Sequence, residues 1–598
     1  MIRPTPDANP TGLPTTAGNA ARGRAHLARW KDAAADNWFL ADENLIEVLQ
    51  LHLGAEYEAW RERFEAFGAE VAGPVRRAAD ETGRVEHEPR LRRWDGIGRR
   101  TEQVIFHPDH HVVGRAIHGS GILADYDEPG RERGQLVFQY LLCHNGEAGH
   151  ACPMACTAGL IKILKRLGSE EQQQRFLPFL MDRDHDAGWQ GSQFLTEVQG
   201  GSDVGANAVE ARPVGDGTWR IHGEKWFCSV ANAELFLMTA RPVGAPAGTR
   251  GLGVFAVPRT LEDGTPNRFV LRRLKSKLGT RAMASGEIDF EGALAWPIGP
   301  VESGFKPVIE IVLTTSRIYN AVSSAGMMQR AWLEAAGFAA AREAFGGSIL
   351  RFPTVQRLLA EIRTETAAAV SSTWAIIALA DKLATGGATE LERGAFRVLV
   401  GINKLLTSRQ ATHTVHTAME VLAGNGAIED FSALPRLYRD AYVLEAWEGT
   451  HNVLAAQLLK DVAKYQVDQA LLAWYESILD DAAPVDGELP EGVIAALRAE
   501  LEAVRGVFTG LADKDPGTAS LIVRDLAERA MRLGQGLCLL GEARAVLTAG
   551  SSHSLKPILL DHYVATHIRR LPSDRDPGIL ARLAALSGAP SRTPSETP

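Results

Sequence analysis

The stretch LTEVQGGSDV, residues 195–204, marks the point at which the periodicity of this 598-residue sequence changes. Gly200 and Gly201 next to Ser202 would let the backbone approach a ligand closely and direct N–H donors at a phosphate. A plain β-turn accounts for the same residues, and both interpretations stay open on this segment alone. No Gly-x-Gly-x-x-Gly pattern follows a strand here, so the sequence does not support a Rossmann dinucleotide site.

The sequence before this stretch, from Asp42 to about Asp186, has mainly helical periodicity. Apolar residues at positions 160, 163, 164 and 167 fall on one helix face. Gly168 suits the C′ position after that helix. Ser169 and Gln172 then form a capping box, which predicts that a second helix begins immediately afterwards.

After residue 188 the sequence shows short β-rich runs, separated by turn clusters such as Gly215-Asp216-Gly217. These runs are Trp219–His222, Leu235–Met238, Gly253–Val257 and Glu287–Phe290. They predict a small antiparallel β domain. Helical periodicity returns near Gly304 and persists to about Tyr465, and the Ala-rich, nearly uncharged stretch from Thr364 to Ala380 is typical of a helix buried on most sides.

The predicted fold class is mainly α, with a central antiparallel β domain and a C-terminal helical module that follows a linker at Asp480–Gly487. The expected divisions are a flexible N-terminal leader (1–37), a helical domain (38–188), a middle β domain (189–298), a second helical domain (299–465), the C-terminal helical module (466–575) and a disordered tail (576–598).

The composition is that of a soluble globular protein, with 45% hydrophobic and 23% charged residues. A net charge of −9 gives no general attraction for nucleic acid or anionic membranes, and no run of 18 consecutive apolar residues predicts a membrane span. Five cysteines in so long a chain do not form a disulfide framework. We therefore expect a cytoplasmic enzyme without a membrane partner.

One cluster uses residue types that bind zinc: Cys143, His144, His150, Cys152 and Cys156. The spacing matches no Cys-x2-Cys pairing, and the segment that follows reads as a buried helix in which cysteine acts as a small apolar residue. We therefore expect no metal site.

Two further segments admit a functional and a structural interpretation. In GEKWFCS, residues 223–229, Trp226 and Phe227 would point to opposite faces of a strand, so that one could line a ligand slot while the other packs inside. In REAFG, residues 342–346, Arg342 and Phe345 would share a helix face and could hold a pyrophosphate and an adenine. The structural interpretation of the first segment is an aromatic residue that packs within a strand. That of the second is a surface arginine lying over a core phenylalanine.

Glu448 lies in the sequence AWEGT, residues 446–450. Thr450 is a plausible N-cap for the following helix, which places Glu448 in the short turn before it. A carboxylate between Trp447 and Gly449 could be desolvated enough to act as a base. A favourable contact with the helix dipole explains the same residue without chemistry.

Taken in order, these segments resemble the acyl-CoA dehydrogenase superfamily. The shared features are the Thr-Glu-x-x-x-Gly-Ser-Asp loop, the Gly-x-Lys-x-aromatic strand, Arg-x-x-Phe-Gly, a Gly-x-Gly at 424–426 followed by Tyr-Arg-Asp at 438–440, and the aromatic-Glu-Gly-Thr turn. The resemblance implies helical, β-barrel-like and helical domains that hold FAD between the subunits of a homotetramer or homodimer. It also implies an acyl-CoA or related thioester substrate and an acceptor such as electron-transfer flavoprotein.

The resemblance assigns a role to each matching residue. Glu448 matches the base that removes the α-proton of the thioester, while the β-hydride passes to flavin N5. Thr196 and Ser229 match hydroxyl contacts to the flavin ring, and Phe227 matches the aromatic side chain beside it. The other matches to cofactor-binding positions are Leu195, Gly201, Ser202 at the pyrophosphate, Arg342 and Phe345 reaching the FAD of a neighbouring subunit, Gly424, Asn425 and Gly426 near the adenosine half, Thr450 and Asn452.

Some features are similar to one branch of this superfamily, the AidB-like flavoproteins. They lie at residues 197–203, 225–230 and 434–439, and at 93–95 with 106–108, so the resemblance covers roughly 38–570. Two features depart from small dehydrogenases. The segment GTRAMASG at 279–286 lacks their Asp-Thr-Arg, and Pro353 and Glu420 stand where glutamine often contacts FAD.

The leading functional expectation is an FAD-dependent acyl-CoA dehydrogenase that acts on a bulky or unusual acyl group. One alternative is an AidB-like protein that associates with DNA and protects it against alkylation damage. Residues 466–598 contain 13 Lys/Arg against 18 Asp/Glu, which disfavours DNA, although Arg569-Arg570 or arginines 524, 529 and 532 could form a local patch. A flavin oxidase or monooxygenase on the same fold is the third possibility.

Overall fold

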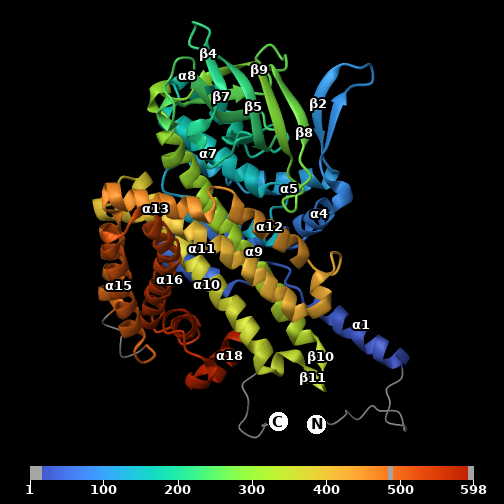
Figure 1. The fold of residues 1–598 in the computed structure, drawn as a ribbon. Coiled ribbons are helices and arrows are strands. Elements are labelled where there is room, and N and C mark those ends of the chain that lie inside the picture. The colour runs from blue at the N-terminus through green and yellow to red at the C-terminus, as the bar shows by residue number, and fades with distance from the viewer. Residues whose placement is uncertain (1–15, 483–488, 590–598) are drawn as a thin grey trace.

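A β region stands at one end of a long helical bundle, and further helices pack along the side of that bundle (Figure 1). The computed structural model describes residues 16–482 and 489–589. Apolar residues at helical spacing build the bundle, and the β-rich runs between them build the sheet. A central, mainly antiparallel β domain lies between helical domains, as predicted.

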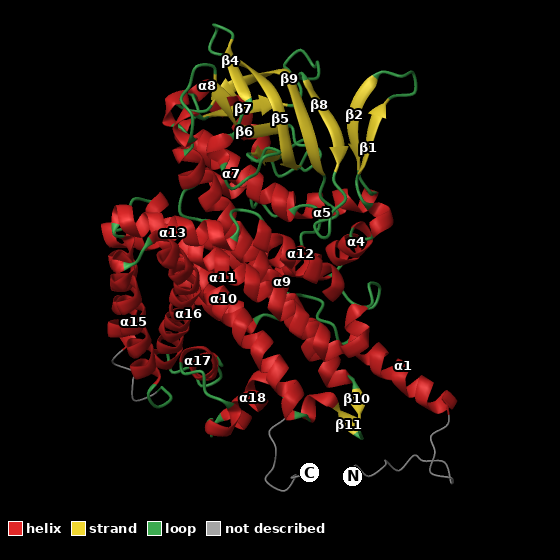
Figure 2. Ribbon diagram, viewed as in Figure 1, coloured by secondary structure: helices red, strands yellow, loops and turns green. Residues whose placement is uncertain are grey.

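The first part of the chain is helical except for one hairpin. Its elements are α1 (Thr16–Asp32), α2 (Glu43–Leu53), α3 (Tyr57–Ala72), α4 (Pro74–Thr82), β1 (Arg90–Trp94), β2 (Arg100–Ile105), α5 (Pro108–Gly119), α6 (Glu132–Leu142), α7 (Ala151–Leu167) and α8 (Glu170–Leu180). The β1–β2 hairpin, which the helical periodicity did not predict, lies beside strand β8 of the middle domain (Figure 2).

The β domain closes on itself. Its strands are β3 (Gly191–Phe194), β4 (Glu210–Pro213), β5 (Trp219–Ser229), β6 (Leu235–Pro242), β7 (Gly253–Pro258), β8 (Phe269–Leu274) and β9 (Ser285–Pro297). The order β6-β4-β5-β9-β7 returns to β6, which makes a five-stranded barrel, while β3 and β8 pair at its sides. Most pairs are antiparallel as predicted, but β6 runs parallel to both β3 and β4.

The last part of the chain is again helical, and α10 lies at its centre. The elements are α9 (Thr314–Ala341), β10 (Glu343–Ala344), β11 (Gly347–Ser348), α10 (Pro353–Ala384), α11 (Glu390–Leu422), α12 (Leu434–Ala446), α13 (His451–Tyr465), α14 (Val467–Ala482), α15 (Val493–Gly510), α16 (Pro516–Thr548), α17 (Lys556–Tyr563) and α18 (Ile579–Ser587). By length and composition α10 could cross a membrane, but α9, α11 and α16 cover it and most of its apolar window is buried.

Local signals near residue 168 are partly confirmed. The Ser169–Gln172 capping box forms and begins α8 as predicted. Gly168 directly follows α7, but its backbone is extended rather than left-handed. A Cβ at this position would lie 2.6 Å from the carbonyl oxygen of Leu164, so the glycine allows a close backbone approach instead of a left-handed cap.

The expected flexible leader and disordered tail are partly wrong. Residues 16–32 form α1, in which Trp30 is buried against Phe338 and Phe431. Residues 579–587 form α18, which buries Leu586 against the bundle. Both segments carry enough apolar side chains to pack against the helical bundle. The Pro-containing polar sequence next to them hides this signal. Residues 1–15 and 590–598, and most of the expected linker (483–488), lie outside the described residues.

Candidate active and flavin site

The loop after β3 is attached to β5 by a buried ion pair. The Nζ of Lys225 lies 2.8 Å from Oε1 of Glu197, and both side chains are almost completely buried. The Glu197 carboxylate also accepts the backbone N–H groups of Ala208 and Val209. Because every partner of this carboxylate is supplied within the fold, Glu197 positions the loop and is not available for acid–base chemistry.

The neighbouring hydroxyl residues are available to a ligand. The carbonyl oxygen of Thr196 accepts the N–H of Trp226, which places Thr196 beside β5. Within the described part of the chain the side-chain hydroxyls of Thr196, Ser202 and Ser229 have no hydrogen-bond partner. Phe227, two residues before Ser229, leaves 53% of its surface exposed. Free hydroxyls beside an exposed aromatic ring suit a ring-shaped ligand with polar edges.

The prediction that Trp226 and Phe227 point to opposite faces is wrong. The pairing of β5 with β9 shifts register between Lys225 and Cys228, so the strict alternation of side chains is broken there. The ammonium of Lys275 lies over both rings, 3.4 Å from the centroid of Trp226 and 4.8 Å from that of Phe227. Neither ring packs inside the barrel.

Glu448 occupies the predicted turn between α12 and α13. Its φ of 60° lies in the left-handed region, and Gly449 follows with a φ of 96°. Trp447 packs against the core of the helical bundle and also against that of the β barrel. The turn therefore lies where the two domains meet. A non-glycine residue with positive φ persists only where surrounding contacts hold it.

Two buried cations hold this turn through its backbone. The Nε of Arg317, on α9, donates to the carbonyl oxygen of Glu448 at 3.1 Å. The Nζ of Lys404, on α11, donates at 3.0 Å to the carbonyl oxygens of Glu445 and Gly449. No described residue donates a hydrogen bond to the Glu448 carboxylate, so its oxygens are available.

The surroundings of Glu448 shift three pKa values. Burial raises the pKa of Glu448, while the charges of Lys404 and Arg317 act in the opposite direction. Burial lowers the pKa of Lys404 to about 7, and the neighbouring Arg317 adds to that effect. Burial also lowers the pKa of Arg317 to about 10. A carboxylate whose pKa is raised toward neutrality is better matched to accepting a proton than one in water.

Thr450 and Asn452 lie at the start of α13, which begins at His451. Thr450 has the backbone conformation of an N-cap, but its side chain makes no capping hydrogen bond. Both side chains are exposed, so their hydroxyl and amide groups remain available to a ligand. The predicted start of the helix is confirmed, and the predicted side-chain cap is absent.

Arg342 and Phe345 do not share a helix face. The helix α9 ends at Ala341, and residues 343–348 form a two-stranded hairpin in which Phe345 and Gly346 make the turn. Both turn residues have positive φ, which is the conformation of a two-residue hairpin loop and excludes a helix here. Phe345 is 66% exposed at the tip.

Within one chain the predicted cofactor residues fall into two groups, one at each end of α9. Gly424, Asn425 and Gly426 lie in the turn after α11, whose following segment brings Phe431 against Phe338 near the end of α9. Arg317 marks the other end of α9, beside Glu448. The 25 residues from Arg317 to Arg342 correspond to roughly 35–40 Å along a helix. Figure 1 shows the β10–β11 hairpin at the opposite end of the bundle from the barrel.

The loop that departs from small dehydrogenases is held by Asp440. Its carboxylate accepts the N–H of Thr280 at 2.6 Å and the N–H of Glu147 at 3.0 Å. A Cβ on Gly279 would lie 2.3 Å from the carbonyl oxygen of Arg439, so only glycine permits this approach. Asp440 of the Tyr-Arg-Asp motif therefore positions the 279–281 loop against α12. Pro353 begins α10, and Glu420 is exposed near the end of α11.

The cysteine and histidine residues near position 150 are buried and serve the fold. The Nδ1 of His144 pairs with the carbonyl oxygen of Tyr140, and the Nε2 of His150 pairs with that of His110. Cys152 and Cys156 lie one helical turn apart, with 3.8 Å between their sulfur atoms. In the described chain, the group of side chains with metal-ligand spacing is a different one, at His111, His185 and Asp186.

Sequence reasoning missed Arg317 and Lys404. Each is a single cation in an otherwise apolar or neutral helical stretch, TTSRIYNAV and GINKLLTS. A lone charged residue on a buried helix face is the signal that could have identified them, because such a charge needs a specific partner.

Three family models match consecutive parts of the chain. The AidB N-terminal domain, described as belonging to the adaptive response protein AidB, matches residues 30–187. The acyl-CoA dehydrogenase middle domain matches residues 192–293, and the C-terminal domain of the same family matches 302–463. The chain belongs to the acyl-CoA dehydrogenase family, a family of FAD-containing oxidoreductases.

Within that family the chain belongs to the AidB-like branch. AidB of Escherichia coli (strain K12) is 31% identical over 441 residues, covering 72% of this chain and 78% of that protein. Acyl-CoA dehydrogenase family member 11 of Caenorhabditis elegans is 31% identical over 399 residues, and the match spans 63% of this chain and 64% of that protein.

Solved structures agree with this assignment. A crystal structure of Caenorhabditis elegans ACDH-11 in complex with C11-CoA has a TM-score of 0.82 and 26% identity, covering 88% of this chain and 90% of that chain. An acyl-CoA dehydrogenase complexed with FAD from Bacillus anthracis shares the fold, with a TM-score of 0.63 and 19% identity, covering 81% and 89%. As a member of this family the chain has FAD as its cofactor, and the free hydroxyls beside the exposed Phe227 fit it.

Proposed function

We propose that this protein is an FAD-dependent acyl-CoA dehydrogenase, in which Glu448 removes the α-proton of an acyl thioester. The observation that carries the proposal is the state of the Glu448 carboxylate. It stands in a turn at the junction of barrel and bundle, burial raises its pKa, and no described residue donates to its oxygens. Nearby cations bond the backbone instead of the carboxylate.

The chain's own residues orient the reaction and move one proton. When bound, FAD supplies the acceptor for the hydride that leaves the β-carbon. Glu448 takes the α-proton onto a carboxylate oxygen. The charges of Lys404 and Arg317 limit the rise in its pKa that burial causes, which favours the ionised carboxylate. Thr196, Ser229 and Phe227 would hold the ring system, with Leu195 and Gly201 shaping the loop around it.

Acyl-CoA is the proposed substrate, and the C11-CoA complex of the Caenorhabditis elegans structure supports a medium or longer acyl chain. An electron-transfer flavoprotein is the proposed acceptor. We assign Arg342, Phe345 and Gly424–Gly426 to the FAD of a neighbouring subunit, because roughly 35–40 Å of α9 separates them from Glu448 within one chain. This assignment makes the active form a homodimer or homotetramer.

The test is an anaerobic titration of the purified flavoprotein with straight and branched acyl-CoAs from C4 to C16. Loss of the oxidised flavin absorbance with at least one acyl-CoA, abolished in Glu448→Gln, is the expected result. If no acyl-CoA reduces the flavin of a protein that retains full FAD content, the proposal fails. Reduction that persists unchanged in Glu448→Gln would remove Glu448 from the mechanism.

The DNA-associated alternative receives no support from the C-terminal module. Two of the arginines that could form its basic patch are used internally: Arg529 makes a bidentate pair with Glu500, and Arg532 binds Glu365. Arg569 donates to the carbonyl oxygen of Glu491. A salt-dependent gel shift with duplex DNA is the measurement that would restore this alternative.

A further inference from the structure

A cluster of histidines lies between α5 and the loop that joins α8 to β3, outside the residues assigned to flavin chemistry. Successive ring pairs are in contact: His110 with His150 at 4.2 Å, His150 with His185 at 5.4 Å, and His118 with His185 at 5.2 Å between centroids. His111 completes the group, 5.5 Å from His185. Such a concentration of imidazoles has no role in the proposed dehydrogenation.

Some ring nitrogens of this cluster lack partners. The Nδ1 atoms of His110 and His185 are buried without any hydrogen-bond partner, and the His110 side chain is only 4% exposed. The cluster therefore contains ring nitrogens whose hydrogen-bonding capacity the fold itself does not use.

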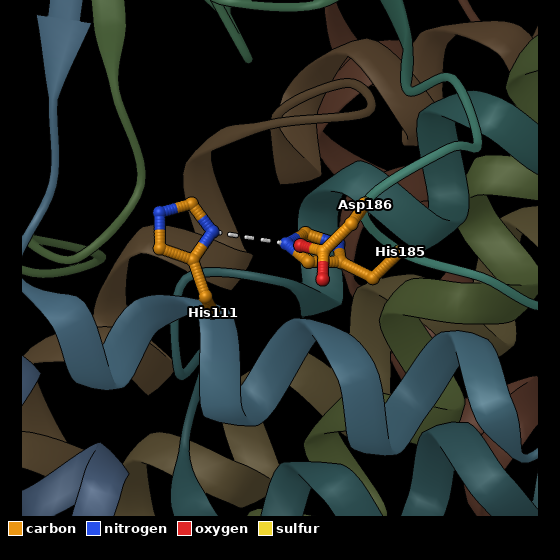
Figure 3. A group of neighbouring side chains, drawn as sticks. All are labelled: His111, His185 and Asp186. Atoms are coloured by element: carbon orange, nitrogen blue, oxygen red, sulfur yellow. Dashed lines mark hydrogen bonds between the residues drawn. The ribbon is translucent and has the colours of Figure 1, made fainter.

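We propose that His111, His185 and Asp186 form a binding site for a divalent transition-metal ion of the zinc class. The Nδ1 of His111 and the Nε2 of His185 share a hydrogen bond of 3.2 Å, which a bound ion would replace, and the ligand atoms of all three residues lie within 4.8 Å of one another (Figure 3). Two nitrogens bound to one zinc ion at about 2.0–2.1 Å in tetrahedral geometry are separated by roughly 3.3 Å. The two imidazoles already have this separation.

Both sides of the site are positioned by the fold. His111 and Arg115 lie one turn apart on the exposed face of α5 and reach toward the loop. A Cβ on Gly114 would lie 2.4 Å from the ring of His185, so this glycine makes room for the His185 side chain. The loop is braced by its own bonds, including the N–H of Asp186 to the carboxylate of Asp184 at 3.0 Å.

Arg115 is the group that competes with a metal ion. Its guanidinium holds the Asp186 carboxylate through two hydrogen bonds, at 2.9 and 3.3 Å. Both side chains are more than half exposed, and a solvent-exposed ion pair of this kind is weak. A rotation of Asp186 brings the carboxylate to the imidazoles, and the solvent-exposed side of the site leaves a fourth position for water. The ion would then join α5 to the segment that leads into β3 and the flavin loop.

The test uses the full-length flavoprotein, stripped with a chelator and titrated with Zn²⁺ by calorimetry and with Co²⁺ by visible absorption. We expect one equivalent to bind, with tetrahedral Co²⁺ bands. His111→Ala and Asp186→Asn should each weaken binding at least tenfold, since each removes a ligand. Arg115→Gln should tighten it severalfold, because it frees Asp186 and removes a positive charge beside the ion.

His553→Ala is the matched control, since His553 is an exposed histidine in a loop outside this cluster, and it should bind as the unaltered protein does. Retained flavin content and an unchanged melting temperature without metal show that each variant is folded; His111 is exposed and its removal should not disturb packing. Zinc should raise the melting temperature of the unaltered protein but not that of His111→Ala. Failure to bind at micromolar Zn²⁺, or equal binding by His111→Ala and the unaltered protein, would overturn the proposal.

Discussion

Two glutamates of the shared motifs, Glu197 and Glu448, stand in contrasting surroundings. Glu197 is buried with Lys225 at 2.8 Å and accepts two backbone N–H groups, so its negative charge is fully compensated. Glu448 also has a buried lysine nearby, but Lys404 donates its hydrogen bonds to backbone carbonyls. The carboxylate of Glu448 receives a long-range charge effect without a direct bond.

On the proposed mechanism, the contrast separates a structural carboxylate from a reactive one. A carboxylate with all its lone pairs occupied gains nothing from accepting a proton, whereas a desolvated one with free lone pairs does. A pair of glutamate and lysine therefore fastens a loop in one place and, on the proposed mechanism, sets the reactivity of a base in the other. The difference lies in whether the lysine donates to the carboxylate itself, as Lys225 does, or to backbone carbonyls, as Lys404 does.

Replacing Glu448 should produce the largest effect on activity. Glu448→Gln removes the proton acceptor and keeps the shape, so the rate of flavin reduction by acyl-CoA should fall about 10²- to 10⁴-fold. Stopped-flow absorbance measures this rate. Glu445→Gln is the control three residues earlier, whose carboxylate pairs with Thr412 and His451 and should leave the rate within a few-fold. Equal losses in both variants would contradict the contrast.

Replacing Glu197 should affect stability most. Glu197→Gln leaves the ammonium of Lys225 buried without its counter-charge, which costs about 3–5 kcal/mol of unfolding free energy. Chemical denaturation followed by fluorescence measures the loss, and FAD retention should fall with it because the loop at Thr196 is released. The exposed pair of Glu210 with Arg212 supplies the control, since Glu210→Gln should change stability by less than about 1 kcal/mol. A Glu197→Gln protein of unaltered stability would remove the structural role.

Replacing Lys404 should change the pH dependence of flavin reduction. The charge of Lys404 lowers the pKa of Glu448, so Lys404→Met should raise that pKa and move the acid limb of the rate profile to higher pH. The pKa of Lys404 is itself lowered to about 7, so the difference from the unaltered protein should be greatest below pH 7 and fade above it. Lys404→Arg keeps the cation and should keep the acid limb. A uniform rate loss at every pH would indicate that Lys404 only supports the turn.

The smallest effect is expected at Thr450. Its side chain makes no capping bond, so Thr450→Ala should cost less than about 0.5 kcal/mol of unfolding free energy. Ser169, whose capping box is formed, should lose about 1 kcal/mol when changed to alanine. Thermal unfolding compares the two. A larger cost at Thr450 than at Ser169 would show that the hydroxyl serves the apoprotein rather than a ligand.

Much of the fold follows from periodicity, because the barrel strands, the buried Ala-rich core of α10 and the turn at Glu448 depend on local patterns. Periodicity does not predict contacts between residues that lie far apart in the sequence. The pairing of Glu197 with Lys225 joins residues 28 positions apart, and Lys404 reaches the turn across 45 positions. The two errors at Trp226 and Phe345 arise from a bulge and a tight hairpin turn, which local propensity does not distinguish from a regular strand or helix.

The length of α9 has a consequence for how the protein responds to dilution. Because this rigid helix keeps Arg342 and Phe345, which follow its last turn, away from the turn at Glu448, a single chain offers only part of the proposed cofactor contacts. Mass action then links FAD retention to subunit association. Flavin should dissociate as the protein concentration falls, and added FAD should restore assembly, so that the colour of the solution reports its quaternary state.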